Sequence, residues 1–166
     1  MKLNLRDVLA SDDQRISFDY SIDLSQEEIN FEFPFQQPVR VTGSLENKAD
    51  VFWLNAKVET MVSTVCARCA KPMEYEKNLE ISLVIAQNDN GDVSDDTYIV
   101  DSDTFELDEI IHEELILSME MAVLCKPDCK GLCPKCGHDL NEGDCGCNRK
   151  EIDPRLAKLQ ELLQDK

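Results

Sequence analysis

Residues 52–85 read FWLNAKVETMVSTVCARCAKPMEYEKNLEISLVI, and this stretch decides which kind of fold the chain can form. Apolar residues alternate with polar ones from Phe52 to Val62 and again from Tyr75 to Ile85. Alternation with a period of two is typical of strands that bury one face. Between the two runs lies the pair Cys66 and Cys69, as CARC. The sequence therefore predicts a long antiparallel hairpin with a CxxC pair at its tip.

The rest of the chain contains weaker signals of the same kind. We expect strands at 15–23, 39–45 and 97–100, a polar turn at 46–48, an exposed loop at 88–96 and a helix at 107–121. Asp153-Pro154 is typical of a helix start, which predicts a short amphipathic C-terminal helix. The expected fold class is α+β. An antiparallel β-rich domain with one packed helix occupies residues 1–123, and a cysteine-rich zinc-binding lobe with a terminal helix occupies 124–166.

The chain has eight cysteines, six of them within residues 125–147: Cys66, Cys69, Cys125, Cys129, Cys133, Cys136, Cys145 and Cys147. The first residues lack an apolar stretch of signal-peptide length, and no segment approaches a membrane span. We therefore expect a cytoplasmic protein with no membrane association. Thiols stay reduced in the cytoplasm, so this many cysteines indicates metal binding rather than disulfides.

Structural zinc sites use four ligands that commonly arrive as two close pairs, so eight cysteines predict two zinc ions. We favour one site of Cys133, Cys136, Cys145 and Cys147, and another of Cys66, Cys69, Cys125 and Cys129. A rival grouping places Cys129 with Cys133, Cys136 and one of the last two cysteines. Residues 124–148 have few apolar side chains, so metal must help to order them.

Other chemistry competes with structural zinc as an interpretation of these residues. The cysteines could instead serve an iron–sulfur or thiol redox protein, although CxxC at a hairpin tip is not the strand-to-helix setting of redox motifs. His138 could replace one thiolate ligand. His112-Glu113 begins like a HExxH metalloprotease motif, but position 116 is isoleucine. Without a recognisable catalytic constellation, we expect neither an enzyme nor a small-molecule substrate.

Acidic residues outnumber basic ones by 34 to 17, giving a net charge of −17. Such an excess opposes general affinity for nucleic acid, because phosphate binding needs local positive charge. Four basic side chains beside the cysteine pairs are nevertheless candidates for local RNA contact: Arg68, Lys71, Lys130 and Lys135. Ordinary solubilising charge explains them equally well.

Four motifs together resemble the bacterial YceD family of large ribosomal RNA subunit accumulation proteins. They are CARC at 66–69, CKGLCPKCG at 129–137, DLN at 139–141 and DPRL at 153–156, and the likeness spans residues 50–165. The resemblance implies a cytoplasmic, non-enzymatic factor needed for accumulation of large-subunit (23S) ribosomal RNA. Its partner would be that RNA, a precursor particle, or a basic ribosomal protein that the acidic sheet shields until assembly.

Overall fold

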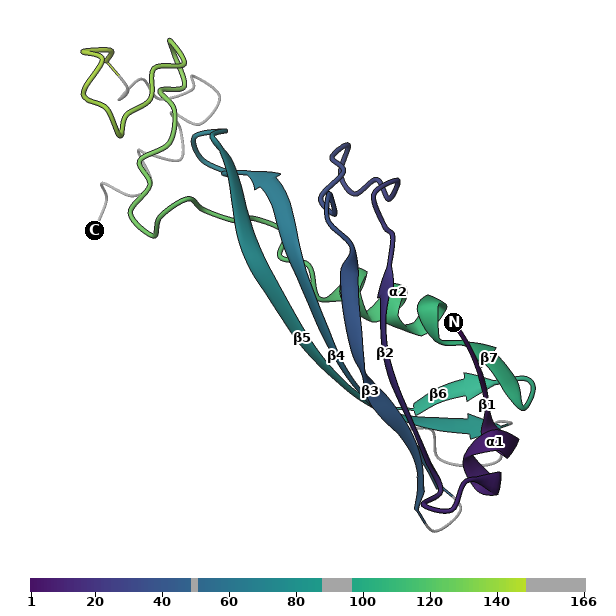
Figure 1. The fold of residues 1–166 in the computed structure, drawn as a ribbon. Helices are drawn as coiled ribbons and strands as arrows, with labels where there is room; N and C mark the ends of the chain where they lie inside the picture. The colour runs from purple at the N-terminus through teal and green to yellow at the C-terminus, as the bar shows by residue number, and fades with distance from the viewer. Residues whose placement is uncertain (49–50, 88–96, 149–166) are drawn as a thin grey trace, which may run out of the picture. The chain divides into compact units, whose positions relative to one another are not determined.

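The computed structural model describes residues 1–48, 51–87 and 97–148. A five-stranded sheet forms the main layer, with its strands in the order β2-β3-β4-β5-β6 (Figure 1). The strands are β2 (Arg15–Ile22), β3 (Val39–Lys48), β4 (Val51–Val65), β5 (Pro72–Gln87) and β6 (Thr97–Val100). The β2–β3 and β3–β4 pairs are antiparallel, whereas β6 runs parallel to β5. The expected α+β class with a mainly antiparallel sheet is confirmed.

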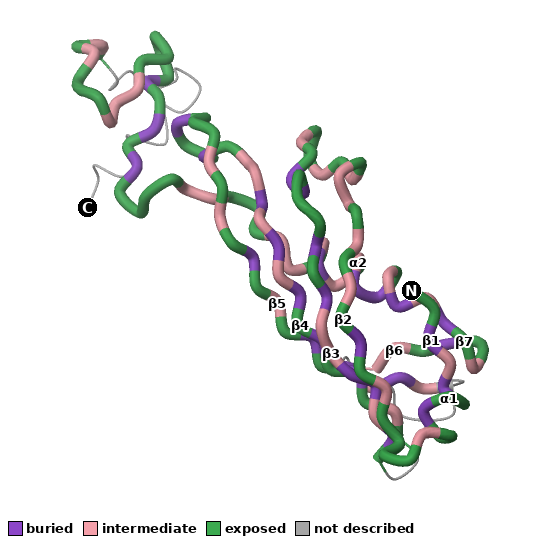
Figure 2. Tube along the Cα trace, in the orientation of Figure 1, coloured by how far each residue is buried: buried purple, intermediate pink, exposed green. Residues whose placement is uncertain are grey.

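The predicted hairpin is formed by β4 and β5, which are neighbours in the sheet. Ser63 Oγ donates to Glu74 at 3.2 Å near the tip, and Ser82 Oγ donates to Asn55 Oδ1 at 3.1 Å farther along, so side chains of the two strands pair at both places. Buried and exposed residues alternate along β4 (Figure 2). The period-two pattern in the sequence therefore corresponds to one buried face, as expected.

One face of the sheet is covered by α2 (Leu107–Leu117), whose Leu107, Ile110, Ile111 and Leu115 join the same core as the strands. Two short strands, β1 (Lys2–Asn4) and β7 (Thr104–Glu106), pair with each other, and α1 (Leu5–Ala10) follows β1 directly. The sequence did not predict β1, α1 or β7, because elements of three to six residues are too short to show a period.

Two predicted boundaries were wrong. Helix α2 ends at Leu117 rather than at Met121, and there the buried Lys77 ammonium group donates to the Ser118 carbonyl at 2.5 Å. Strand β3 continues through Lys48, where a turn was expected, because Glu46 and its neighbours pair with β4. The loop expected at 88–96 and the helix expected after Asp153 lie outside the described residues.

Contacts within the chain define two compact units. The first comprises residues 1–64 and 72–121, and the second comprises residues 65–71 and 122–166. The tip of the β4–β5 hairpin thus belongs to the second unit, whereas the sequence analysis placed a single boundary after residue 123. In the described part of the chain, no helix combines the length and apolar character needed to cross a membrane.

Candidate metal centres

Cluster 1 consists of Cys66, Cys69, Cys125 and Cys129, which come from the hairpin tip and from the chain after α2. The four Sγ atoms lie within 4.8 Å of one another. The Sγ atom of Cys66 is 3.8 Å from that of Cys129, and the Sγ atom of Cys69 is 3.7 Å from that of Cys125. Cys125 is exposed, and the other three are buried. All four belong to the second unit.

Cluster 2 consists of Cys133, Cys136, Cys145 and Cys147, whose Sγ atoms also lie within 4.8 Å of one another. Cys133 is buried, and the other three cysteines are exposed or partly exposed. The two groups are those that the sequence analysis favoured, and Cys129 lies with cluster 1 rather than with Cys133 as in the rival grouping. His138 is in neither group, and its carbonyl accepts a hydrogen bond from Cys133 N–H at 2.8 Å.

The CxxC pairs of the two clusters sit in turns with matching backbone hydrogen bonds. In cluster 1, Ala70 N–H donates to the Cys66 carbonyl at 2.8 Å, and Cys66 N–H donates to the Lys71 carbonyl at 2.9 Å. In cluster 2, Gly137 N–H donates to the Cys133 carbonyl at 2.8 Å, as the equivalent of Ala70. The residue after the second cysteine has a left-handed backbone in both turns, with φ 55° at Ala70 and 74° at Gly137.

The sulfur positions can be tested against a tetrahedral ion. Four thiolates at about 2.3 Å from zinc, placed at the corners of a tetrahedron, lie about 3.8 Å apart. The two close Sγ–Sγ distances in cluster 1, 3.7 and 3.8 Å, agree with that value. They exclude disulfides, which need about 2.05 Å between sulfur atoms, and all eight cysteines are free. Both clusters can therefore hold a metal ion, and zinc is compatible with the donor set.

A network of polar groups supports cluster 1. Asn141 Nδ2 donates to Cys129 Sγ at 3.4 Å, while Asn141 Oδ1 accepts from Lys130 N–H at 2.9 Å. The same amide nitrogen also donates to Asp139 Oδ1 at 2.7 Å. Asn141 belongs to the DLN motif, but its role as a partner of the cluster was not predicted, because it lies 12 residues from Cys129 and no local pattern records that contact.

Arg68 fits closely against the loop that carries Cys129. Its guanidinium group donates to the Cys129 carbonyl at 2.9 Å, and its own carbonyl accepts from Leu132 N–H at 3.1 Å. Gly131 has φ 73°, and a Cβ atom there would lie 2.9 Å from the Arg68 carbonyl oxygen. Glycine is therefore required at 131 by both backbone conformation and space.

Lys71 bridges two carboxylates, Asp139 at 2.7 Å and Glu142 at 3.1 Å. The Lys71 ammonium group lowers the pKa of Asp139 to about 2, and the two carboxylates raise the pKa of Lys71. Two of the four predicted RNA-contact residues, Arg68 and Lys71, therefore already make intramolecular contacts. Lys130 is exposed beside cluster 1, and Lys135 lies in the turn of cluster 2.

The thiols within a cluster differ in acidity. Hydrogen bonds from backbone N–H groups, first that of Cys125, lower the pKa of Cys66 to about 6, and those of Cys136 and Lys135 lower the pKa of Cys133 to about 6. Desolvation and the neighbouring thiols raise the pKa of Cys125 to about 12. Hydrogen bonding to Cys136 and to other cluster thiols likewise raises the pKa of Cys147 to about 12. A cation that enters either cluster must therefore displace protons.

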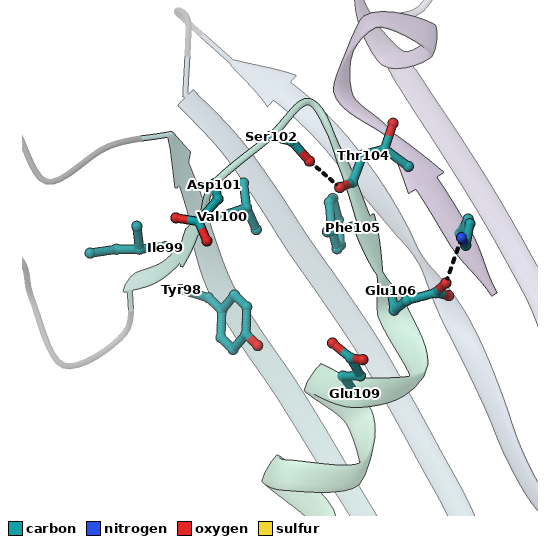
Figure 3. A pocket seen from close by; sticks show the side chains of 10 residues that line it. Tyr98, Ile99, Val100, Asp101, Ser102, Thr104, Phe105, Glu106 and Glu109 are labelled. Atoms are coloured by element: carbon teal, nitrogen blue, oxygen red, sulfur yellow. Dashed lines mark hydrogen bonds and ion pairs between the residues drawn. The ribbon is translucent and has the colours of Figure 1, made fainter.

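A separate hollow of about 340 Å³ lies beside β6 and β7 (Figure 3). Lys2 pairs with Glu106 at 3.1 Å, and Ser102 Oγ donates to the Thr104 carbonyl at 2.6 Å. Among the described residues that line this hollow, no serine, cysteine or histidine lies beside a base in the manner of an activated nucleophile. We assign no chemistry to it.

The fold and the clusters define a class: a β-rich α+β protein with two four-cysteine groups able to hold metal ions. The family model described as "Large ribosomal RNA subunit accumulation protein YceD" matches residues 54–163, and the chain belongs to this family.

This chain aligns with three curated relatives and covers a different share of each. "Uncharacterized protein YlbN" of Bacillus subtilis is 27% identical over 91% of this chain and 90% of that protein. "Uncharacterized protein Rv2926c" of Mycobacterium tuberculosis is 33% identical over 59% of this chain and 49% of that protein. "Large ribosomal RNA subunit accumulation protein YCED homolog 1, chloroplastic" of Arabidopsis thaliana is 26% identical over 81% of this chain and 52% of that protein. The chain thus spans about half the length of the last two. No solved structure matches.

Proposed function

We propose that this protein is a non-enzymatic ribosome biogenesis factor that supports accumulation of large-subunit (23S) ribosomal RNA by binding a basic protein of the precursor particle. Membership of the YceD family and the name of the Arabidopsis relative support the ribosomal role. The proposal places the protein in the compartment where ribosomes assemble.

The intramolecular contacts of two basic side chains favour a protein partner over RNA. Arg68 and Lys71, two of the basic side chains nearest the cysteine turns, are bound to the Cys129 carbonyl and to Asp139 and Glu142. The chain as a whole has twice as many acidic as basic residues. Opposite charge steers association and suppresses wrong partners, so a surface of this sign favours lysine- and arginine-rich proteins.

Local RNA contact is the second candidate. Residues 125–150 are the least acidic part of the chain, with five basic and four acidic residues, and they include Lys130 and Lys135. Binding through phosphate neutralisation would weaken steeply with salt.

We further propose that each cluster binds one structural zinc ion through its four cysteines, and that the two ions stabilise the folded second unit. Elemental analysis of the purified protein should find about two zinc atoms per chain and a colourless solution. Brown protein that absorbs visible light would instead indicate an iron–sulfur centre.

The functional proposal is tested by crosslinking in lysate, with and without nuclease, in a strain that expresses the tagged protein. We expect basic large-subunit proteins to remain crosslinked after nuclease treatment, and depletion of the protein to lower 23S relative to 16S RNA. Crosslinks to 23S RNA that disappear with nuclease would favour the second candidate. Normal levels of both RNAs after full depletion would overturn the ribosomal role.

A further inference from the structure

The loop between β2 and β3, residues 23–38, exposes two large aromatic side chains. Phe31 is 95% exposed and Phe33 is 48% exposed. Scattered apolar residues are common on protein surfaces, but an aromatic ring almost fully in water contributes nothing to the core. The fully exposed ring of Phe31 and the half-exposed ring of Phe33, separated by Glu32, mark a surface that can be covered by a partner.

The backbone at this tip has a conformation that phenylalanine rarely adopts. Asn30 has φ 53° and Phe31 has φ 67°, between Ile29 and Glu32, which form an isolated antiparallel bridge. Both backbone N–H groups of that bridge donate across it, at 2.9 and 3.0 Å. Two consecutive left-handed residues make the tight hairpin turn whose second position strongly favours glycine. A bulky residue there is strained, and local strain concentrates at functional positions.

The base of the loop is held to the sheet. Thr64 Oγ1 donates to Glu32 Oε2 at 2.9 Å, and Ser63 N–H donates to the Pro34 carbonyl at 2.9 Å. Phe35 is fully buried in the core, with 1% of its surface exposed. The chain is thus anchored between the two exposed rings and directly after them, which lowers the entropy lost on binding.

The charge of the loop selects the partner. Residues 23–38 contain four carboxylates, Asp23, Glu27, Glu28 and Glu32, and no lysine or arginine. Phosphate would be repelled, whereas ammonium and guanidinium groups would be attracted. Lysine and arginine also bind favourably over aromatic faces, so rings among carboxylates suit a cationic segment.

We infer that Phe31 and Phe33, with the surrounding carboxylates, form the docking surface for a lysine- or arginine-rich segment of a protein. The inference rests on the proposed function, because it specifies where the basic partner binds. It goes further by assigning binding to a loop in the first unit, whereas all eight cysteines belong to the second unit.

Site-specific crosslinking tests the surface directly. A photoreactive phenylalanine analogue is placed at position 31, and in a matched control at Leu9, which is 50% exposed on α1 at the other end of β2. The probe is the RNA-free protein fraction of purified large ribosomal subunits. We expect position 31 to crosslink lysine- or arginine-rich peptides, identified by mass spectrometry, and Leu9 to give none. Equal crosslinking from both positions, or crosslinks to peptides without excess positive charge, would overturn the inference.

Binding by variants separates this role from a structural one. Phe31→Ala with Phe33→Ala should weaken binding of the crosslinked protein by about tenfold or more, whereas Leu9→Ala should leave it unchanged. Phe31→Gly should weaken binding without lowering the Tm, because glycine relieves the backbone strain. If Phe31→Gly lowers the Tm and leaves binding intact, the ring is structural and the inference fails. If the wild-type protein binds none of the basic proteins, the proposed function is contradicted as well. If the wild-type protein binds them and the loop variants bind equally well, only the docking surface is contradicted.

Discussion

At the scale of single residues, the two CxxC turns are the same structure built from different sequences. Gly137 occupies the left-handed position after Cys136, where glycine is the residue that adopts this backbone most easily. The equivalent position after Cys69 is Ala70. A side chain in the left-handed region costs about 1–2 kcal/mol relative to glycine. The turn at the hairpin tip therefore carries strain that its counterpart lacks.

Ala70→Gly should raise the zinc affinity of cluster 1, because the strained residue is replaced by one that adopts this backbone freely. Gly137→Ala should lower the affinity of cluster 2 for the same reason. A change of about 1 kcal/mol corresponds to about fivefold in affinity. Competition with a chelator measures both changes, and effects of the same sign in the two variants would contradict the equivalence of the turns.

Asn141→Ala should weaken metal binding at cluster 1 by about tenfold or more, as loss of a group hydrogen-bonded to a ligand commonly does. The Asn141 amide is the main cause that lowers the pKa of Cys129, so its removal leaves a less stable thiolate. Cobalt(II) titration followed by its thiolate absorption reports the affinity. Cluster 2 serves as the internal control, and Asn141→Ala that weakens both clusters equally would point to general unfolding instead.

At the scale of elements, β3 packs too closely against its neighbours to carry a side chain at Gly43. A Cβ atom there would lie 2.2 Å from the Asn55 carbonyl oxygen and 2.9 Å from the Phe18 ring. Gly43 pairs with Phe18 on β2 and with Ala56 on β4, so the strand is clamped on both sides. Glycine usually weakens a strand, but here it permits the close approach of the backbones.

Gly43→Ala should destabilise the first unit by about 2–3 kcal/mol, because the added methyl group forces the backbone of β3 or β4 to move. Thr42→Ala is the matched control, since Thr42 is half-buried at the adjacent position, and it should change little. Urea unfolding followed by fluorescence of Trp53, the single tryptophan, measures both. Equal stabilities would show that the sheet adapts.

At the scale of the whole molecule, the two units are stabilised in different ways. Every residue of the hydrophobic core, including the partly buried ones packed against it, falls between Leu3 and Met119 among the described residues. The second unit holds the eight cysteines and a network of backbone and polar contacts instead. We therefore expect the first unit to be stable through packing and the second to depend on metal bound at its clusters, as proposed above.

Removal of metal with a strong chelator should unfold the second unit and leave the first intact. Amide hydrogen exchange should show lost protection at residues 122–148 and retained protection in β2 to β5. Cys133→Ser with Cys136→Ser should reproduce the loss around cluster 2 in the presence of zinc. Retained protection of residues 122–148 in the metal-free protein would contradict the dependence on metal.

Acidification should release the metal. Thiols in the unfolded chain titrate near their ordinary pKa, so the metal-bound form holds fewer protons and its stability rises with pH. The pKa values of about 12 at Cys125 and Cys147 mean that these thiols lose protons on binding. The affinity for zinc should therefore fall as the pH is lowered from about 8 to about 5. Calorimetry in buffers of different ionisation enthalpy measures the protons released when zinc binds. Affinity independent of pH would rule out thiolate ligands.

The long β4–β5 hairpin, the helix that covers the sheet and the cysteine pairs could all be predicted from the sequence, because period-two alternation, helical spacing and CxxC are local signals. The sequence also indicated which cysteines share a cluster, although local spacing left the rival grouping open. Three features became visible only in the folded chain: Asn141, Asp139 and Lys71 converge beside cluster 1, Lys77 donates to the end of α2, and β6 joins the sheet in parallel. Those contacts join residues far apart in the chain, and no periodic pattern records such pairings.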